Sequence, residues 1–571
     1  MLFRREEGNC DRQYETVEET VKNEVPLRKS FPDFSFGTNA VSKAKLMTGM
    51  AHSLLAVIGG MTGAMAFAPG NFPPATLLGI AILVVLAAGS GIRGAAWYGW
   101  LWGTGLNVCS FFWLREIHPI IPFPLGMLLA IPYAVLSGFV PVLALNKTGM
   151  STWRQILCTA GLAGGYVLIC EYSRSAILPW NYLSSTLWRV PVLLGLLPFA
   201  GPFLLSFLLA MLGIGVGLAL VWRKIFFLLP MSVLIVSAFA AGELFRSSFP
   251  AEQISEYRFA LIQGDISQRR NADRREADEA LDTYLKLSRN SLSQKADFTI
   301  WPETAVPYAI YGPGPFSGRY RRELRQLISD SRRKFLIGSL DYRAESDTTV
   351  SSVNSAMLFD RSGTLTGTYN KMHLVPFGEY IPFRRFLPAS LIQRIDMGRD
   401  LTSGNNSAPL AFESNNLRAG MMICFEDVFP GIPRESVRRG ANILLTITND
   451  AWFPLSSEPE QHLANVVMRA VENNLYFIRV GNNGGSCVID PTGRIGQVLQ
   501  VPGSGPEEIR RGRGWNVVKV YAPNVPRLTF YAKTGDWIIW FCAAIFLVAI
   551  IILKRTNGKD HKKVLHDQEH T

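Results

Sequence analysis

The chain of 571 residues is 48% hydrophobic and 18% charged, and its formal net charge is +12. This charge does not indicate nucleic-acid binding, because no basic stretch interleaved with aromatic residues is apparent and much of the excess lies beside apolar segments. The seven cysteines form no CxxC pair, which argues against a zinc site or a disulfide framework. A disulfide between Cys424 and Cys487, the two cysteines outside the apolar segments and the N-terminal extension, stays open.

The distribution of apolar residues divides the chain into five parts. Residues 1–45 form a polar extension, and residues 46–243 are almost devoid of charge, which predicts a membrane domain of seven helices. Residues 244–533 have the composition of an ordinary globular protein. An eighth apolar helix over residues 534–554 and a polar tail over residues 555–571 complete the chain.

Eight segments have the length and composition of membrane spans, for which about 20 mostly apolar residues are needed. Their centres lie near Val57, Ile82, Gly105, Ala134, Leu162, Phe207, Val233 and Leu547. Because residues 1–45 are polar, they hold no cleavable signal peptide, and we expect the first span to act as a signal anchor.

Basic residues in the short loops predict the orientation of the membrane domain. With eight spans, four basic positions fall on one side of the membrane: Arg93, the loop 147–154, Arg223–Lys224 and Lys554–Arg555. The opposite loop, residues 69–73, carries no charge. Loops rich in Lys and Arg face the cytoplasm, so both termini are expected there and residues 244–533 outside it.

Two ionisable residues, Glu171 and Arg174, end the fifth predicted span just before Pro179–Trp180–Asn181. At such depth ionisable groups face a cavity or each other, whereas at the membrane surface this spacing gives a simple i,i+3 ion pair. Both interpretations stay open. Four tryptophans are interpreted as an aromatic belt at the membrane surface: Trp97, Trp100, Trp102 and Trp113.

The globular part alternates between short apolar or β-branched runs and helical patterns. The predicted strands are residues 259–263, 298–301, 335–339, 356–359, 419–424, 443–448 and 476–480. The predicted helices are residues 274–291, 318–333 and 460–474. This alternation predicts an α/β domain.

Three segments supply a carboxylate, an amine and a thiol. Glu303 lies in W-P-E-T directly after a predicted strand, Lys371 in Y-N-K-M-H-L-V-P-F-G-E, and Cys424 in I-C-F-E-D at another strand end. Taken singly, each has an ordinary structural explanation as a loop carboxylate, a surface charge and a small buried side chain.

Together these groups suit acyl transfer. A thiol with a pKa of about 8.5 needs help to react as a thiolate at neutral pH. A carboxylate accepts the thiol proton and later moves it to a leaving group. An ammonium group favours the thiolate and stabilises the oxyanion of the tetrahedral intermediate, while the thiol carries the acyl group. No cofactor or metal is needed for this chemistry.

The motifs around these residues resemble those of the nitrilase superfamily, whose triad is Glu, Lys and Cys. The similarity is greater to its membrane-bound branch, the apolipoprotein N-acyltransferase family. It rests on W-P-E-T, Y-N-K-x-H-L-V-P-F-G-E-Y-I-P, C-F-E-D and T-N-D-A-W-F, and on Gln461–His462 followed by R-A-V-E. Phe67–Ala68–Pro69 and Glu171 to Trp180 extend it, so that it runs from about Met47 to Leu553.

The resemblance implies a polytopic α-helical membrane protein of about eight spans that carries an αββα sandwich. It implies Glu303 as general base, Lys371 as the group that stabilises the transition state and Cys424 as nucleophile. Four further residues are implied to support them: Glu379, Phe425, Glu426 and Trp452. Many family members have tyrosine where Phe425 stands.

The implied reaction is an acyl exchange between two lipid-anchored substrates. Cys424 takes an acyl chain from a membrane phospholipid, and the thioester passes it to the N-terminal diacylglyceryl-cysteine amine of an apolipoprotein. We expect a monomer in the bacterial inner membrane with its catalytic domain on the periplasmic side. The segment Phe383 to Ile395, which mixes aromatic, aliphatic and Arg residues, is either a membrane-surface segment or a helix packed on the domain.

Two other functions stay open. The first is a membrane-tethered amidase or nitrilase with a small amide as substrate, against which the extensive apolar half argues. The second is a channel or scaffold with a degenerate outer domain, against which the presence of all three candidate residues argues.

Overall fold

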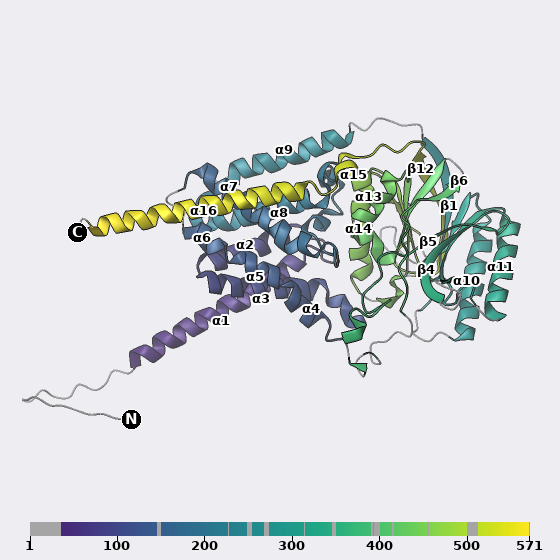
Figure 1. The fold of residues 1–571 in the computed structure, drawn as a ribbon, viewed down its shortest axis with the longest axis horizontal. Helices are drawn as coiled ribbons and strands as arrows, with labels where there is room; N and C mark the ends of the chain where they lie inside the picture. Colours follow the sequence, from purple (N-terminus) through teal and green to yellow (C-terminus); the bar gives the residue numbers. More distant parts are fainter. Residues whose placement is uncertain are drawn as a thin grey trace, which may run out of the picture. The chain divides into compact units, whose positions relative to one another are not determined.

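The structure is a computed structural model that describes residues 36–145, 150–225, 228–247, 254–267, 273–312, 315–344, 350–386, 388–389, 392, 400–413, 416–453, 456–499 and 512–569. By its internal contacts the chain separates into residues 1–51 and residues 52–571. The second unit holds the helices from α2 onward and all the described strands (Figure 1).

Two six-stranded sheets form the globular half of this unit, in the orders β12-β1-β2-β3-β4-β5 and β11-β10-β9-β8-β7-β6. The first contains β1 (Ile254–Gln263), β2 (Phe298–Ile300), β3 (Lys334–Ala344), β4 (Val350–Phe359), β5 (Leu365–Asn370) and β12 (Gly514–Pro523). The second contains β6 (Leu410–Glu413), β7 (Leu417–Ile423), β8 (Ile443–Thr448), β9 (Phe477–Gly481), β10 (Cys487–Ile489) and β11 (Ile495–Gly496). The strands β1 to β3 run parallel, as do β7 to β9, so the chain needs crossover helices between them.

The two sheets face each other and carry helices on their outer faces (Figure 1). Apolar side chains of both sheets share one core, in which the rings of Phe298 and Phe412 lie 5.2 Å apart. On the first sheet lie α10 (Arg274–Ser291) and α11 (Pro315–Ser331), and on the second α13 (Gly431–Arg438) and α14 (Glu458–Asn473). The layers are therefore helix, sheet, sheet and helix, and the predicted α/β class is confirmed.

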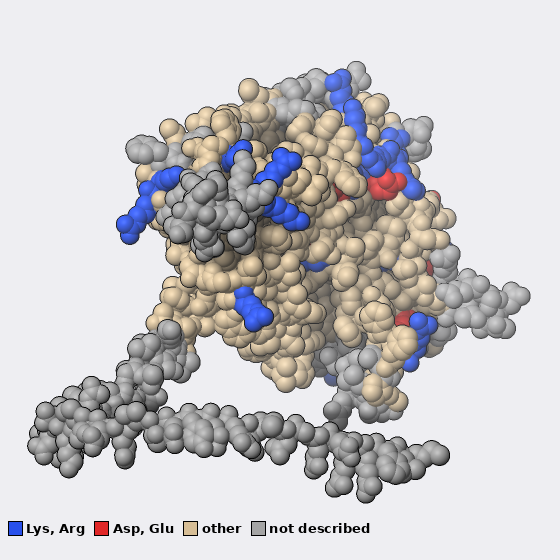
Figure 2. Space-filling model, turned by 60° about the vertical axis from the view of Figure 1, so that its left-hand side comes forward, with Lys and Arg blue, Asp and Glu red and all other residues tan. Residues whose placement is uncertain are grey.

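The helical half precedes and follows these sheets in the chain. Its α-helices are α1 (Phe36–Ala64), α2 (Pro74–Ala88), α3 (Ile92–Ser110), α4 (Pro122–Leu129), α5 (Ile131–Ser137), α6 (Val140–Leu145), α7 (Thr152–Tyr166), α8 (Leu197–Trp222), α9 (Leu228–Ser247) and α16 (Ile538–Glu569). Figure 2, in which the helices at the left of Figure 1 are turned toward the reader, shows a mostly uncharged surface whose coloured side chains are chiefly Lys and Arg. Such a surface suits contact with lipid.

Each of the eight predicted span centres lies within a helix, but the described helices differ in length and composition. Four stretches are long and apolar enough to cross a membrane: Pro122–Ala144, Thr152–Arg174, Leu197–Trp222 and Ile538–Arg555. Two shorter apolar helices cover Pro74–Ala88 and Met231–Leu244. The chain thus has the helices of an integral membrane protein, while the number of eight spans stays a prediction.

The predicted aromatic belt is wrong for Trp102. Its side chain is 1% exposed and donates a hydrogen bond from Nε1 to the carbonyl oxygen of Gly79 at 2.8 Å. Trp97, by contrast, is exposed and stacks on Trp100 with 5.4 Å between ring centroids. Trp102 serves as a packing residue between helices because neighbouring glycines leave room for its ring, and composition alone does not reveal this.

The helix α16 packs along α7 through two glycines of α7. A Cβ atom at Gly161 would lie 2.2 Å from Ala549 Cβ, and one at Gly164 would lie 2.7 Å from the carbonyl oxygen of Cys542. Small residues let two apolar helices approach until their backbones touch, which is the main source of attraction between helices in lipid.

We predict that Gly161→Leu weakens the packing of α16 on α7. The added side chain overlaps Ala549, and overpacking of this kind costs about 1–3 kcal/mol. The expected result is a melting temperature several degrees lower in detergent, measured by loss of monodisperse protein on heating. Gly318→Ala in α11 is the control, because a Cβ atom there meets nothing within 4 Å; equal melting temperatures for both variants would contradict the prediction.

Candidate active site

Glu303 lies in the turn after β2, where the chain passes over the neighbouring strand β3. The buried ring of Trp301 anchors this turn by donating a hydrogen bond from Nε1 to Ser288 Oγ at 2.9 Å. Gly338 of β3 permits the close approach, since a Cβ atom there would lie 2.1 Å from the carbonyl oxygen of Pro302 and 2.6 Å from Glu303 Cα. The place of the buried Glu303 carboxylate is therefore fixed by packing.

Lys371 directly follows β5, and its side chain is 1% exposed. Its Nζ lies 3.2 Å from Glu303 Oε1 and 2.9 Å from Glu379 Oε1. Asn354 of β4 donates its side-chain amide to the same two oxygens, at 2.7 Å and 3.1 Å. A buried ammonium group must be paired in this way, because its removal from water is otherwise too costly.

Cys424 begins the 3-10 helix η8 (Cys424–Val428) at the end of β7, with a left-handed φ of 53°. This conformation is unfavourable for a residue with a side chain, so its surroundings must hold it. Glu426 does so by accepting hydrogen bonds from the Ile423 N–H (2.8 Å), the Tyr369 hydroxyl (2.9 Å) and the N–H groups of Met372 (2.6 Å) and His373 (3.1 Å). One carboxylate thus joins the Cys424 turn to the segment that carries Lys371.

Burial and charge together set the protonation of these groups. Burial disfavours the ammonium form of Lys371, but Glu303 and Glu379 outweigh it and hold the pKa of Lys371 well above its usual value. Burial raises the pKa of Glu303 against the opposing effect of Lys371. Burial also raises the pKa of the Cys424 thiol well above its usual value, with Glu303 adding to the rise and Lys371 opposing it. A raised pKa favours the protonated thiol, which needs a proton acceptor before it can react.

Aromatic rings from both halves of the chain lie beside the Cys424 turn. Phe425 is nearly parallel to Trp180, with 6.2 Å between ring centroids, and edge-on to Phe429 at 5.1 Å. Phe425 has no hydroxyl, and these described contacts are made by its ring alone. Trp452 ends the 3-10 helix η9 (Asp450–Trp452) after β8 and is 40% exposed. The helical half therefore contributes a ring, Trp180, next to the candidate site.

The loop that carries Trp180 is held by Glu171 and Arg174. Glu171 accepts the Leu183 N–H at 2.7 Å, and Arg174 donates to main-chain carbonyls. The carbonyl oxygens that Arg174 binds belong to Cys170, Leu178, Trp180 and Asn181. The ion-pair interpretation is wrong, because the described contacts of Glu171 and Arg174 include no salt bridge between them and each binds main-chain atoms instead. The cavity interpretation stays a prediction.

One buried group of potential metal donors lies behind η8 among the described residues: Asp450, Glu458 and His462. The Arg479 guanidinium donates to Asp450 Oδ2, and Thr448 Oγ1 donates to its Oδ1 at 2.7 Å. One cationic side chain and one hydroxyl already bind the two oxygens of this carboxylate, which makes the group an ion network and a poor metal site.

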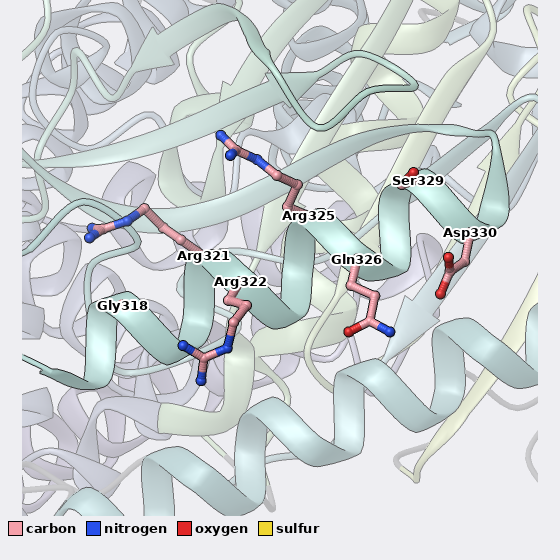
Figure 3. Close-up of a pocket in the computed structure, with 7 residues that line it drawn as sticks. All are labelled: Gly318, Arg321, Arg322, Arg325, Gln326, Ser329 and Asp330. Atoms are coloured by element: carbon pink, nitrogen blue, oxygen red, sulfur yellow. The ribbon is translucent and has the colours of Figure 1, made fainter.

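The pocket drawn in Figure 3 lies away from these residues, on one face of α11. It is lined by Gly318, Arg321, Arg322, Arg325, Gln326, Ser329 and Asp330. These positions recur every three or four residues, so they form a single helix face with long, solvated side chains. The pocket contains none of the predicted site residues.

The structure brings the sequence-predicted residues Glu303, Lys371 and Glu379 into direct contact, and Cys424 and Glu426 lie in the adjoining turn. Trp452 lies on a neighbouring turn.

Cys424 and Cys487 are both free thiols, so no disulfide joins them. Asn354 was not predicted as a site residue, because it lies in the polar first half of β4, before the predicted strand 356–359.

The two sheets and the family models agree on the class of this domain. The carbon-nitrogen hydrolase model matches residues 258–501, and the model of the apolipoprotein N-acyltransferase N-terminal domain matches residues 59–215. The domain is thus of the carbon-nitrogen hydrolase class, joined to a helical membrane domain. An amidase of the nitrilase superfamily from Nesterenkonia covers 49% of this chain and 95% of its own at 18% identity, with a TM-score of 0.33.

Curated relatives extend the similarity over most of the chain. The apolipoprotein N-acyltransferase of Azotobacter vinelandii is 32% identical over 79% of this chain and 87% of its own length. The relative from Pseudomonas paraeruginosa is 30% identical over 90% of this chain and 98% of its own length. The relative from Geobacter metallireducens is 28% identical over 89% of this chain and 96% of its own length. The chain belongs to the apolipoprotein N-acyltransferase family.

We predict that Asn354→Ala shifts the acid limb of Cys424 acylation to higher pH. The Asn354 amide favours the ionised form of Glu303, so its loss raises the pKa of Glu303 further. A general base acts only when it is ionised. As the pH falls, the variant is therefore expected to lose activity at a higher pH than the unmodified chain does. Single-turnover acylation measured across pH tests this. Asn370→Ala is the control, because Asn370 binds the Ser355 hydroxyl instead; coincident acid limbs for all three proteins would refute the assignment.

Proposed function

We propose that this enzyme transfers an acyl chain from a membrane phospholipid, through a thioester on Cys424, to the N-terminal diacylglyceryl-cysteine amine of apolipoproteins. The observation that carries the proposal is the buried contact of Lys371 with Glu303 and Glu379 beside the Cys424 turn, in a chain with membrane-spanning helices. The relatives named apolipoprotein N-acyltransferase support the two substrate classes.

In the first half-reaction, Glu303 takes the proton of the Cys424 thiol, and the sulfur attacks the ester carbonyl carbon of the phospholipid. The Lys371 ammonium stabilises the resulting oxyanion, and its strong pairing keeps it charged throughout. Collapse of the tetrahedral intermediate breaks the C–O bond, and Glu303 returns the proton to the leaving alkoxide. The products are the Cys424 thioester and a lysophospholipid.

In the second half-reaction, the amine of the acceptor attacks the thioester carbon. Glu303 accepts the proton that the amine loses as the C–N bond forms. The C–S bond then breaks, and the thiolate regains its proton from Glu303. Glu379 and Asn354 hold Lys371 and Glu303 in place through both steps, and Glu426 holds the strained Cys424 backbone.

For the topology we propose eight spans with both termini in the cytoplasm and the sheets on the periplasmic side of the inner membrane. The proposed parts are residues 1–45, 46–243, 244–533, 534–554 and 555–571. The start of β1 at Ile254 and the start of α16 at Ile538 support the boundaries of the catalytic part, whereas α9 extends to Ser247, three residues beyond the proposed start at residue 244. Three chain segments of this one protein supply all the proposed catalytic groups, which supports a monomer as the active unit.

Access for lipids is supported by exposed aromatic residues after Lys371. The exposed fractions of Phe377, Phe383 and Phe386 are 57%, 76% and 70%. Arg384 and Arg385 accompany them in a short 3-10 helix, η7 (Arg384–Phe386). Exposed rings beside basic side chains suit the surface of an anionic membrane. The greater part of the predicted segment beyond Phe386 lies outside the described residues.

We predict that incubation with phospholipid alone adds one acyl mass to the Cys424 peptide, as measured by mass spectrometry. Cys424→Ala abolishes the adduct and all transfer. Cys487→Ala is the matched control, because Cys487 is buried on β10 and burial raises its pKa to about 12. An unmodified Cys424 peptide, together with hydrolysis of a small amide, would instead favour the membrane-tethered amidase.

A further inference from the structure

The N-terminal turn of α14 connects the Cys424 turn with the helical half. Gln461 Oε1 accepts hydrogen bonds from the indole N–H groups of Trp180 at 2.8 Å and Trp113 at 3.1 Å. Its Nε2 donates to the carbonyl oxygens of Ala68 at 2.9 Å and Ser110 at 3.1 Å. One buried amide thus binds three loops of the helical half, and it uses its oxygen and its nitrogen fully.

His462, the next residue, binds the other side of this junction. Its Nε2 lies 2.7 Å from Asp427 Oδ1 and 3.3 Å from the carbonyl oxygen of Cys424. Its Nδ1 lies 3.3 Å from Asp450 Oδ1 and 3.6 Å from Glu458 Oε1. The ring therefore joins η8, which begins with Cys424, to η9 at the end of the neighbouring parallel strand.

Oxygen atoms on both sides of the His462 ring favour its doubly protonated form. Acceptor oxygens face both nitrogens of His462, and a neutral imidazole has only one N–H. The imidazolium form satisfies both sides, and the nearby Asp427 and Asp450 raise the pKa of His462 well above its usual value despite its burial. The ring is buried, and it binds the main chain of Cys424 rather than the reacting sulfur.

We propose that His462 is a positioning residue that fixes the strained Cys424 backbone where its sulfur can reach the substrate, and that Gln461 fixes this turn relative to the membrane loops. The ring of Trp180, which Gln461 binds, lies on Phe425 and at 5.7 Å from the ring of His462. The inference rests on the proposed function, because it treats Cys424 as the nucleophile. It assigns to the helical half a share in the geometry of the active site.

Two acyl donors separate positioning from folding in the detergent-solubilised full chain: a phospholipid and the water-soluble p-nitrophenyl acetate. His462→Gln replaces the ring by a polar amide, which has a donor at one end only and cannot donate in both directions. It is expected to lower the maximal rate of Cys424 acylation about 10- to 100-fold with both donors, at an unchanged half-saturating concentration, because a misplacement of about 1 Å has this effect. Asn473→Ala on the same helix removes a buried hydrogen bond to Arg469 O and is the control for a merely structural loss.

Gln461→Leu tests the second part of the proposal. It keeps the size of the side chain but removes all its hydrogen bonds, so the phospholipid reaction is expected to slow while the p-nitrophenyl acetate reaction stays unchanged. The role of Gln461 is overturned if both reactions slow equally, or if neither reaction slows. The role of His462 is overturned if His462→Gln is acylated as fast as the unmodified chain. It is also overturned if the rate falls only in proportion to the folded fraction, as expected for Asn473→Ala.

The two donors also keep the proposals distinguishable. If the unmodified chain is acylated by p-nitrophenyl acetate but by no phospholipid, the proposed function fails. The comparison of His462→Gln with the unmodified chain on the soluble ester then still decides whether His462 positions the thiol.

Discussion

The structure depends on one buried cation, the Lys371 ammonium group. Removing such a charge from water is so costly that the fold must supply compensation within hydrogen-bond distance. Glu303 and Glu379 provide it from segments that follow β2 and β5, and Asn354 of β4 holds these two carboxylates by donating its amide to both. The register of these strands is therefore tied to the chemistry, because a slip of one residue would leave a buried charge without its partners.

The same logic explains why α14 is unusual. All its residues except Glu460 are buried, including Gln461, His462 and Arg469, since the second sheet lies on one side and the membrane helices on the other. Every polar side chain on such a helix needs a defined partner. Arg469 finds the Glu472 carboxylate at 2.7 Å and the Val428 carbonyl oxygen at 3.1 Å. The helix thus joins the two halves through specific polar contacts as well as through apolar packing.

Sequence predicted the α/β class, the seven central strands and the convergence of Glu303 with Lys371, because local periodicity and motif context report on these features. It predicted α10 to the residue, since Asp273 and Glu276 form a capping box at its start. It did not reveal Asn354 or the roles of Trp180 and Gln461. The Trp180–Gln461 contact joins residues 281 positions apart, and no local pattern encodes a pairing at that distance. The belt prediction failed at Trp102 because the space between two helices depends on which glycines face each other.

The close contact of α16 with α7 has a mechanical consequence. Both α9, which leads into the sheets, and α16, which leaves them, also contact α8. The catalytic domain is thus an insertion whose entry and exit are tethered to one helical bundle. A domain on a single tether swivels freely about it, whereas two tethers on a common support suppress rotation. The two sheets, which carry Glu303, Lys371 and Cys424, can therefore keep one orientation relative to the helical bundle.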